Sequence, residues 1–192
     1  VGSEMCIRDR DNYVHTVEDE HIVQSSVEGW ELKPVAYVLG LTNLILNGID
    51  VPNYVYDDTL SKDYNSIGSK DQVDVILANP PFGASIADGV ETNFPASFRC
   101  KESADLFVIL MLKLLKPYGR CAIVLPDGSI TGDGVKARIR EKLLSDCNLH
   151  TIIRLPQSTF FPATVNTNLL FFEKGSPTKE IWYYEHKLPE GQ

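Results

Sequence analysis

One short segment of the chain combines residue types that could hold a small planar substrate: Asn79-Pro80-Pro81-Phe82. The two consecutive prolines fix φ and lack backbone donors, and each restricts the residue before it, so the segment should form a stiff corner. Asn79 offers a side-chain carbonyl and Pro80 a backbone carbonyl as hydrogen-bond acceptors. Two converging acceptors suit an amino group with two N–H donors, and Phe82 can stack on the flat ring that carries it.

The elements that must position this corner follow an alternating pattern. The apolar segment 73–78 ends directly before Asn79, and it is typical of a parallel strand buried on both faces. Other strands are predicted at 21–27, 54–56, 120–125, 149–155, 168–172 and 181–184, and helices at 33–46, 104–115 and 135–144, with a loop at 83–101. This alternation predicts an α/β fold with a mostly parallel sheet, in which ligands bind beyond the carboxyl ends of the strands.

The composition is that of a globular protein. The chain has 192 residues, of which 43% are apolar and 23% are charged, enough for one domain with a sizeable core. No apolar run approaches the ~20 residues of a membrane span, and no signal peptide is recognisable, so we expect no membrane partner. The formal net charge of -8 makes the chain a poor general binder of nucleic-acid phosphates, so any basic surface must be local or belong to a partner.

Cysteine and histidine usage predicts neither a disulfide framework nor a metal site. The four cysteines lie far apart in the sequence and form no C-x-x-C pair, which fits a reducing cytoplasm. The four histidines have no metal-ligand spacing either.

Read in order, the motifs resemble those of the modification subunits of type I restriction-modification systems, which are N-6 adenine-specific DNA methyltransferases. The motif of amino-group methyltransferases has Asp, Asn or Ser, then two prolines, then Tyr, Phe or Trp. Its Asn and Phe form, as here, is typical of enzymes that act on adenine in DNA. The resemblance spans roughly residues 20 to 175 and includes Gly29–Pro34, Asn43-Leu44, Asn47–Ile49, Ser103–Phe107, Leu115–Arg120, Val124–Gly128, Leu155-Pro156, Phe160–Pro162 and Asn166–Phe172.

The resemblance implies a Rossmann-like class I methyltransferase sheet, mostly parallel with an antiparallel edge. It implies S-adenosyl-L-methionine as the methyl donor and a flipped-out adenine in DNA as the acceptor. A separate subunit would read the DNA sequence, and a restriction nuclease subunit is a further partner to consider. The amino nitrogen of adenine is a weak nucleophile, so its attack on a sulfonium methyl needs placement more than a strong base.

The resemblance also assigns roles to single residues. Asn79 and the Pro80 carbonyl would hold the target amino group within the Pro80-Pro81 corner, Phe82 would stack on the base, and Asn79 would also border the cofactor. Glu31 would hold the ribose hydroxyls of the cofactor, although a glutamate near a helix start also suits the helix dipole. Asp58 would contact the cofactor's adenine, with Asp57 a near-equal candidate and a polar turn the alternative. Phe160 and Phe161 would line the target-base pocket, unless both are core residues.

One family motif is missing from the sequence. A glycine-rich loop of the form Asp-Pro-x-x-Gly-x-Gly should precede the predicted strand 21–27, and residues 1–20 contain nothing similar. We therefore expect an N-terminally truncated fragment: an artefact or scar at 1–10, a poorly defined segment at 11–20, a partial catalytic domain at 21–175, and the start of a C-terminal extension at 176–192. Two other interpretations stay open: an amino- or amide-nitrogen methyltransferase for RNA or protein, and a non-catalytic module that binds partner subunits.

Overall fold

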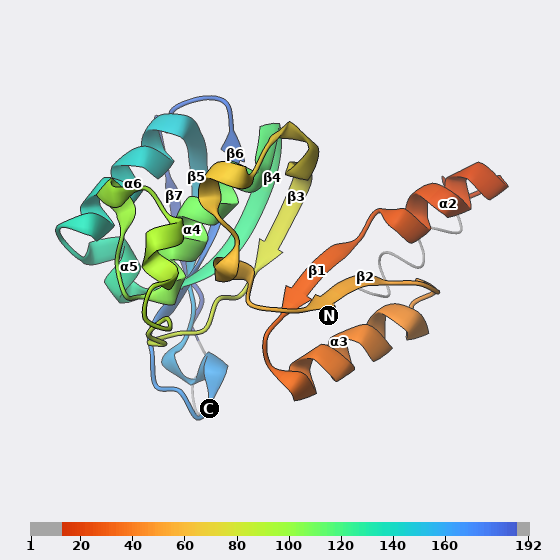
Figure 1. Cartoon of the computed structure of the whole chain (residues 1–192). Helices are drawn as coiled ribbons and strands as arrows, with labels where there is room; N and C mark the ends of the chain where they lie inside the picture. Colours follow the sequence, from red (N-terminus) through yellow and green to blue (C-terminus); the bar gives the residue numbers. More distant parts are fainter. Residues whose placement is uncertain (1–12, 188–192) are drawn as a thin grey trace. The chain divides into compact units, whose positions relative to one another are not determined.

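The computed structural model describes residues 13–187 and has an α/β architecture with two sheets (Figure 1). The chain divides between Thr59 and Leu60 into two compact units. The α/β prediction is confirmed, whereas the artefact expected at residues 1–10 lies outside the described residues. None of the helices between residues 13 and 187 has the length and apolar character needed to cross a membrane.

The smaller unit is a strand–helix–strand motif preceded by a helix. Its elements are α2 (Val17–Ser25), β1 (Glu28–Glu31), α3 (Pro34–Leu46) and β2 (Asn53–Tyr56). β1 and β2 pair in parallel, with Glu31 opposite Tyr56 at their carboxyl ends. The helix predicted at 33–46 and the strand predicted at 54–56 are confirmed.

The strand predicted at 21–27 is wrong, because most of this segment belongs to helix α2. A capping box begins the helix: the Asp19 backbone N–H donates to the Thr16 hydroxyl over 3.1 Å, and the Thr16 N–H donates to the Asp19 carboxylate over 2.9 Å. Acidic residues in the first turn also suit the positive end of the helix dipole. The strand begins only at Glu28, and Glu31 is its last residue.

The ring of Tyr54 joins α3 to the small sheet. It stacks on Tyr37 of α3, with ring centroids 5.3 Å apart and planes at 1°. A Cβ atom added at Gly29 of β1 or at Gly40 of α3 would lie 2.6 Å from atoms of this ring. Glycine at both positions therefore leaves room for the Tyr54 ring between the helix and the sheet.

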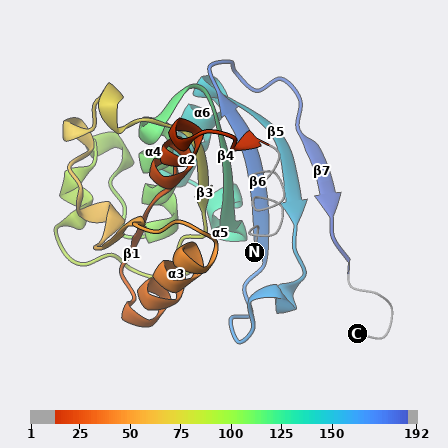
Figure 2. The same cartoon turned by 90° about the vertical axis from the view of Figure 1, so that its right-hand side faces the viewer.

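The larger unit contains a five-stranded sheet in the order β3-β4-β6-β5-β7 (Figure 2). Its elements are β3 (Val73–Ala78), α4 (Ser103–Leu114), β4 (Leu115–Pro126), α5 (Asp127–Thr131), α6 (Val135–Asp146), β5 (Cys147–Arg154), β6 (Thr167–Lys174) and β7 (Trp182–Glu185). Short 3-10 helices lie in the connections: η1 (Thr59–Ser61), η2 (Tyr64–Ser66), η3 (Ser69–Asp71), η4 (Val90–Asn93), η5 (Ala96–Phe98) and η6 (Gln157–Phe160). The helices and strands predicted in this part of the sequence are present, and α5 is an addition.

The antiparallel strand is not at the edge of the sheet, where we expected it. β6 runs antiparallel to both of its neighbours, β4 and β5, whereas β3 with β4 and β5 with β7 are parallel pairs. The loop at 155–166 joins β5 directly to β6, and such a connection without a crossover helix yields an antiparallel pair.

Strand β3 is less buried than its apolar sequence predicted. Among the described strands it pairs only with β4, and Leu77 is 81% exposed. A continuous apolar run is typical of a strand covered on both faces, but coverage depends on neighbouring elements that the run itself does not specify.

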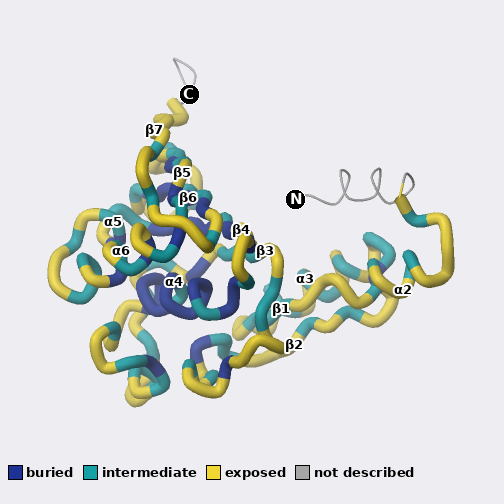
Figure 3. The backbone as a smooth tube through the Cα atoms, turned by 90° about the horizontal axis from the view of Figure 1, so that it is seen from above, coloured by how far each residue is buried: buried dark blue, intermediate teal, exposed yellow. Residues whose placement is uncertain are grey.

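Helix α4 forms the centre of the larger unit. It lies with α5 and α6 on one face of the five-stranded sheet (Figure 1), and almost its whole length is buried (Figure 3). Leu106, Ile109 and Leu110 are fully buried and belong to one apolar cluster with Ile123 of β4 and Phe172 of β6. A helix that is apolar all round must be covered on every side, so α4 dictates where the sheet and α6 lie.

A lysine from the sheet closes the end of α4. Lys174 of β6 donates from Nζ to the carbonyls of Leu112 and Leu115, over 2.6 and 2.8 Å. These bonds satisfy carbonyl groups that the last turn of a helix leaves without partners. Burial lowers the pKa of the Lys174 ammonium, since its surroundings offer less solvation than water.

Replacing Leu110 by alanine should destabilise the larger unit by about 2–5 kcal/mol, because α4 is enclosed and cannot easily collapse onto the space left. Urea unfolding followed by circular dichroism measures this free energy. The matched control is Leu144→Ala on α6, where the side chain is 36% exposed and the cost should stay below about 1.5 kcal/mol. Equal costs for the two variants would contradict the central role of α4.

Candidate functional site

The Asn79–Phe82 corner lies at the carboxyl edge of the five-stranded sheet. It directly follows β3, whose last residue, Ala78, pairs with Ile123 close to the end of β4. The Asn79 side chain is exposed, Pro80 is buried and Phe82 is half-buried. The corner thus follows a strand, as the sequence predicted, and has a buried proline, an exposed amide residue and a half-buried aromatic residue.

The structure brings Phe160 to this corner. The rings of Phe82 and Phe160 meet edge to face, with centroids 5.1 Å apart and planes at 69°. Phe160 is the last residue of η6, which lies in the loop between β5 and β6. Phe161 is 87% exposed, so of the two phenylalanines it is Phe160 that pairs with the corner. Neither aromatic is a fully buried core residue.

A polar network that we did not predict stands at the same edge. Asp127, which follows β4, accepts one hydrogen bond from Arg154 at the end of β5 over 2.9 Å and another from the Asn168 amide of β6 over 2.7 Å. Its backbone N–H also donates to the Asn166 carbonyl over 3.0 Å. Asn168 is buried, so the network ties three strands together where β4 and β5 end and β6 begins. The sequence signal was an acidic residue two positions after the predicted strand 120–125.

Glu31 and Asp58 belong to the smaller unit, at the carboxyl edge of its own sheet. Glu31 is half-buried and its Oε1 accepts a hydrogen bond from the Lys33 backbone N–H over 2.7 Å. Asp57 is exposed and accepts the Asp58 N–H over 2.8 Å, whereas Asp58 is half-buried. Burial raises the pKa of the Tyr54 phenol, and the negative charge of Glu31 raises it further. Parallel pairing of β1 with β2 therefore brings two carboxylates to one edge, where they can accept hydroxyl or amino donors.

Nucleophilic thiol chemistry does not fit the described cysteines. Cys100, Cys121 and Cys147 are free, and burial raises the pKa of each thiol, that of Cys147 to about 12. Such thiols stay protonated at neutral pH, whereas the thiolate is the nucleophile. Within residues 13–187 no group of three or more histidine, cysteine or acidic side chains is placed to hold a metal ion. The chemistry available at the corner is hydrogen bonding and stacking.

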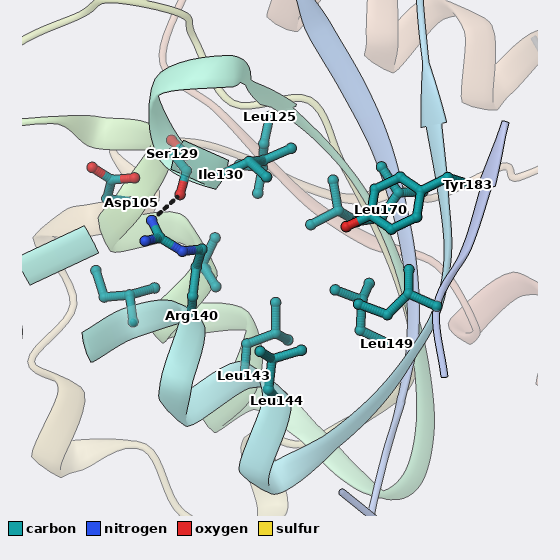
Figure 4. A pocket seen from close by; sticks show the side chains of 14 residues that line it. Asp105, Leu125, Ser129, Ile130, Arg140, Leu143, Leu144, Leu149, Leu170 and Tyr183 are labelled. Atoms are coloured by element: carbon teal, nitrogen blue, oxygen red, sulfur yellow. Dashed lines mark hydrogen bonds between the residues drawn. The ribbon is translucent and has the colours of Figure 1, made fainter. Parts of the chain in front are cut away.

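A separate cavity of about 230 Å³ lies between α6 and the sheet (Figure 4). Its lining is mainly apolar, with side chains such as Leu125, Leu143, Leu149, Ile152 and Leu170. At its polar end, Arg140 donates to the Ser129 carbonyl over 3.2 Å, and Asp105 pairs with Lys136 over 2.8 Å. The cavity contains neither the Asn79–Phe82 corner nor the two carboxylates of the smaller unit, so we do not assign the chemistry to it.

Comparisons with known proteins bear on the family and the fold of the chain. The family model for N-6 DNA methylases matches residues 2–191. The chain is 50% identical over 184 residues to the type I restriction enzyme EcoEI methylase subunit of Escherichia coli, covering 95% of this chain and 37% of that protein. A solved chain of a type I restriction-modification system superposes with a TM-score of 0.89 at 38% identity, covering 99% of this chain and 39% of that one. The crystal structure of the EcoKI M protein gives a TM-score of 0.74 at 26% identity, covering 100% and 41%. The chain thus spans about two-fifths of the length of these relatives, and their class I fold matches the predicted one.

Replacing Asp127 by alanine should lower the free energy of unfolding by about 1–3 kcal/mol, because the buried Asn168 amide and the Arg154 guanidinium lose their shared acceptor. Chemical denaturation measures the difference. Asp133→Ala is the matched control, since this aspartate is exposed in the loop before α6. If the two variants were equally stable, the network would not hold this edge together.

Proposed function

The chain belongs to the N-6 DNA methylase family, and from that premise we propose that it carries the catalytic corner and cofactor carboxylates of an adenine-specific DNA methyltransferase. The reaction moves a methyl group from S-adenosyl-L-methionine to the exocyclic amino nitrogen of adenine. The observation that carries the proposal is the Asn79–Phe82 corner at a strand end, with Phe160 against Phe82. Because an enzyme that modifies DNA must reach the genome, we propose a cytoplasmic location.

The residues of the smaller unit fit the polar groups of S-adenosyl-L-methionine. A ribose offers two hydroxyl donors and an adenine ring offers an amino group, and carboxylates are acceptors for both. Glu31 ends β1 and Asp58 follows β2, so parallel pairing supplies two acceptors at one edge. We assign Glu31 to the ribose and Asp58 to the adenine, with Asp57 as the exposed alternative. When bound, the cofactor supplies the electrophilic methyl group.

The corner would hold the target base through its acceptors and its ring. Asn79 Oδ1 and the Pro80 carbonyl accept the two amino hydrogens, which draws the nitrogen lone pair out of its delocalisation into the ring. Phe82 stacks on the base, and Phe160 borders it from η6. Bound S-adenosyl-L-methionine would supply the methyl group and leave as the thioether, while the amino nitrogen held by Asn79 and Pro80 would release one proton to water. Placement supplies the rate acceleration, since none of these side chains is a strong base.

We infer that a partner supplies many of the contacts that bind DNA. The chain has 26 acidic residues against 18 lysines and arginines, and phosphate contacts require cations. A subunit that reads the DNA sequence is the partner this charge favours, and a nuclease subunit would complete a restriction system. The inference fails if the full-length protein alone binds target DNA tightly and selectively.

Asn79→Ala should lower the turnover number for methyl transfer by about a hundredfold or more, because one of the two acceptors at the reacting nitrogen is lost. The assay measures transfer from radiolabelled S-adenosyl-L-methionine to unmethylated genomic DNA, with RNA and protein as parallel substrates, in the full-length protein with its partners. The matched control is Asn148→Ala, at the amino end of β5, which should keep normal turnover. Near-normal turnover in Asn79→Ala, or wild-type transfer to RNA or protein alone, would overturn the proposed function.

Glu31→Gln should weaken binding of S-adenosyl-L-methionine by about ten- to a hundredfold, since charge-assisted hydrogen bonds to the ribose become neutral. Isothermal titration calorimetry measures the dissociation constant without any turnover. Glu28→Gln provides the control, because it makes the same change at the other end of β1. Equal affinities in the two variants would remove Glu31 from the cofactor site.

A further inference from the structure

We propose that Ser103 is a positioning residue for the Asn79–Phe82 corner: its hydroxyl holds the Pro81 carbonyl and thereby sets the direction of the neighbouring acceptors. This inference rests on the proposed function, because it concerns the same corner. Ser103 is the first residue of α4 and is only 4% exposed. Its Oγ donates to the Pro81 carbonyl over 3.1 Å, across 22 residues of sequence.

The corner needs such an anchor because its own backbone supplies few hydrogen-bond donors. Neither Pro80 nor Pro81 has an N–H, so the middle of the corner cannot be held by backbone donors of its own. Directly beyond it, Gly83 has a φ of +64°, a left-handed conformation that favours glycine and turns the chain away. The carbonyl of Pro81 is therefore a point at which neighbouring structure can fix the geometry.

The start of α4 also holds the segment that follows the corner. The Ser103 backbone N–H donates to the Ala84 carbonyl over 3.2 Å, and the Ile86 N–H donates to the Lys101 carbonyl over 3.1 Å. Ser85 and Glu102 form an antiparallel bridge between these two bonds. Residues 84–86 thus run along residues 101–103 as a short ladder, and the hydroxyl of Ser103 extends that ladder back to the corner.

Lys136 fixes the helix start that carries Ser103. Its Nζ lies 2.6 Å from the Glu102 carboxylate and 2.8 Å from the Asp105 carboxylate, on either side of Ser103 in the sequence. Asp105 is almost fully buried, and a buried carboxylate needs a cation beside it. Burial of Lys136 acts to lower the pKa of its ammonium, but the bonds to both carboxylates outweigh this and leave the pKa above its ordinary value. The ammonium therefore stays charged at neutral pH and ties α6 to the start of α4.

The hydrogen bond from Ser103 should affect the direction of the two acceptors more than the binding of the substrate. The Pro80 carbonyl and Asn79 must point at one nitrogen, and a displacement of about 1 Å in such a site can cost about a hundredfold in rate. Pro81 as a residue is exposed and the hydrogen bond is only part-buried, so loss of the hydroxyl should not leave an unpaired carbonyl deep in the core. Loss of the hydroxyl should therefore change the alignment of the corner much more than the stability of the fold.

The test compares Ser103→Ala, Ser103→Thr and Ser66→Ala in the full-length protein with its partners. Ser66→Ala is the matched control, because Ser66 also donates its hydroxyl to a backbone carbonyl, that of Asp63 over 2.7 Å, but far from the corner in sequence. Methyl transfer to unmethylated genomic DNA gives the turnover number and the KM for S-adenosyl-L-methionine. Thermal unfolding gives the Tm of each variant.

We expect Ser103→Ala to lower the turnover number about ten- to a hundredfold, with KM and Tm close to wild type. Ser103→Thr should restore most of the turnover, because it keeps the hydroxyl, and Ser66→Ala should match wild type throughout. Unchanged turnover in Ser103→Ala, or a loss explained by a lowered Tm, would overturn the positioning role while wild-type activity still supported the proposed function. If Ser103→Thr folds less well, Ser103→Ala alone decides the question. Absence of DNA methylation in the wild type would instead count against the proposed function.

Discussion

The burial of helix α4 is the constraint on which the larger unit depends. Leu106, Ile109 and Leu110 have no exposed surface, so the helix must be enclosed by the sheet and by α6. Because α4 cannot shift without opening this core, both of its ends become fixed points. Lys174 from β6 closes the last turn of α4, and the first residue of α4 contacts the Asn79–Phe82 corner, to which we assign the chemistry. The packing of α4 in the core therefore fixes the position of Ser103, which contacts the corner at the surface.

The two prolines explain why that loop needs support from outside itself. A Pro-Pro step is stiff, but it cannot donate hydrogen bonds, so its direction in space must come from groups that accept or donate around it. At this corner the sheet supplies one side through β3, and α4 supplies the other through Ser103. Phe160 adds an aromatic contact from a third segment, the loop between β5 and β6. Three parts of the chain that are distant in sequence therefore define one small surface.

In each unit of the chain, parallel strand pairing brings polar residues to one edge of the sheet. In parallel pairs the strands end at the same edge, so polar residues placed after successive strands meet there. β1 and β2 bring Glu31 and Asp58 to one edge, and β3 and β4 bring Asn79 and Asp127 to another. Glu31, Asp58 and Asn79 at these edges are hydrogen-bond acceptors, which suits contacts with amino and hydroxyl donors.

The sequence by itself determined the α/β class, the positions of most helices and strands, and the Asn79–Phe82 corner, because apolar periodicity and Pro-Pro geometry are local properties. Tertiary structure decided the rest. The apolar run 73–78 does not specify that β3 pairs with one strand only among the described strands. The residues 21–27 alone do not predict a helix, because the capping box that begins it lies earlier, at Thr16. Three further features depend on which strands become neighbours. They are the internal position of antiparallel β6, the contact of Phe82 with Phe160 instead of Phe161, and the network around Asp127. The hydroxyl of Ser103 gains its partner in the same way, since contacts between residues far apart in the chain follow from packing and not from local pattern.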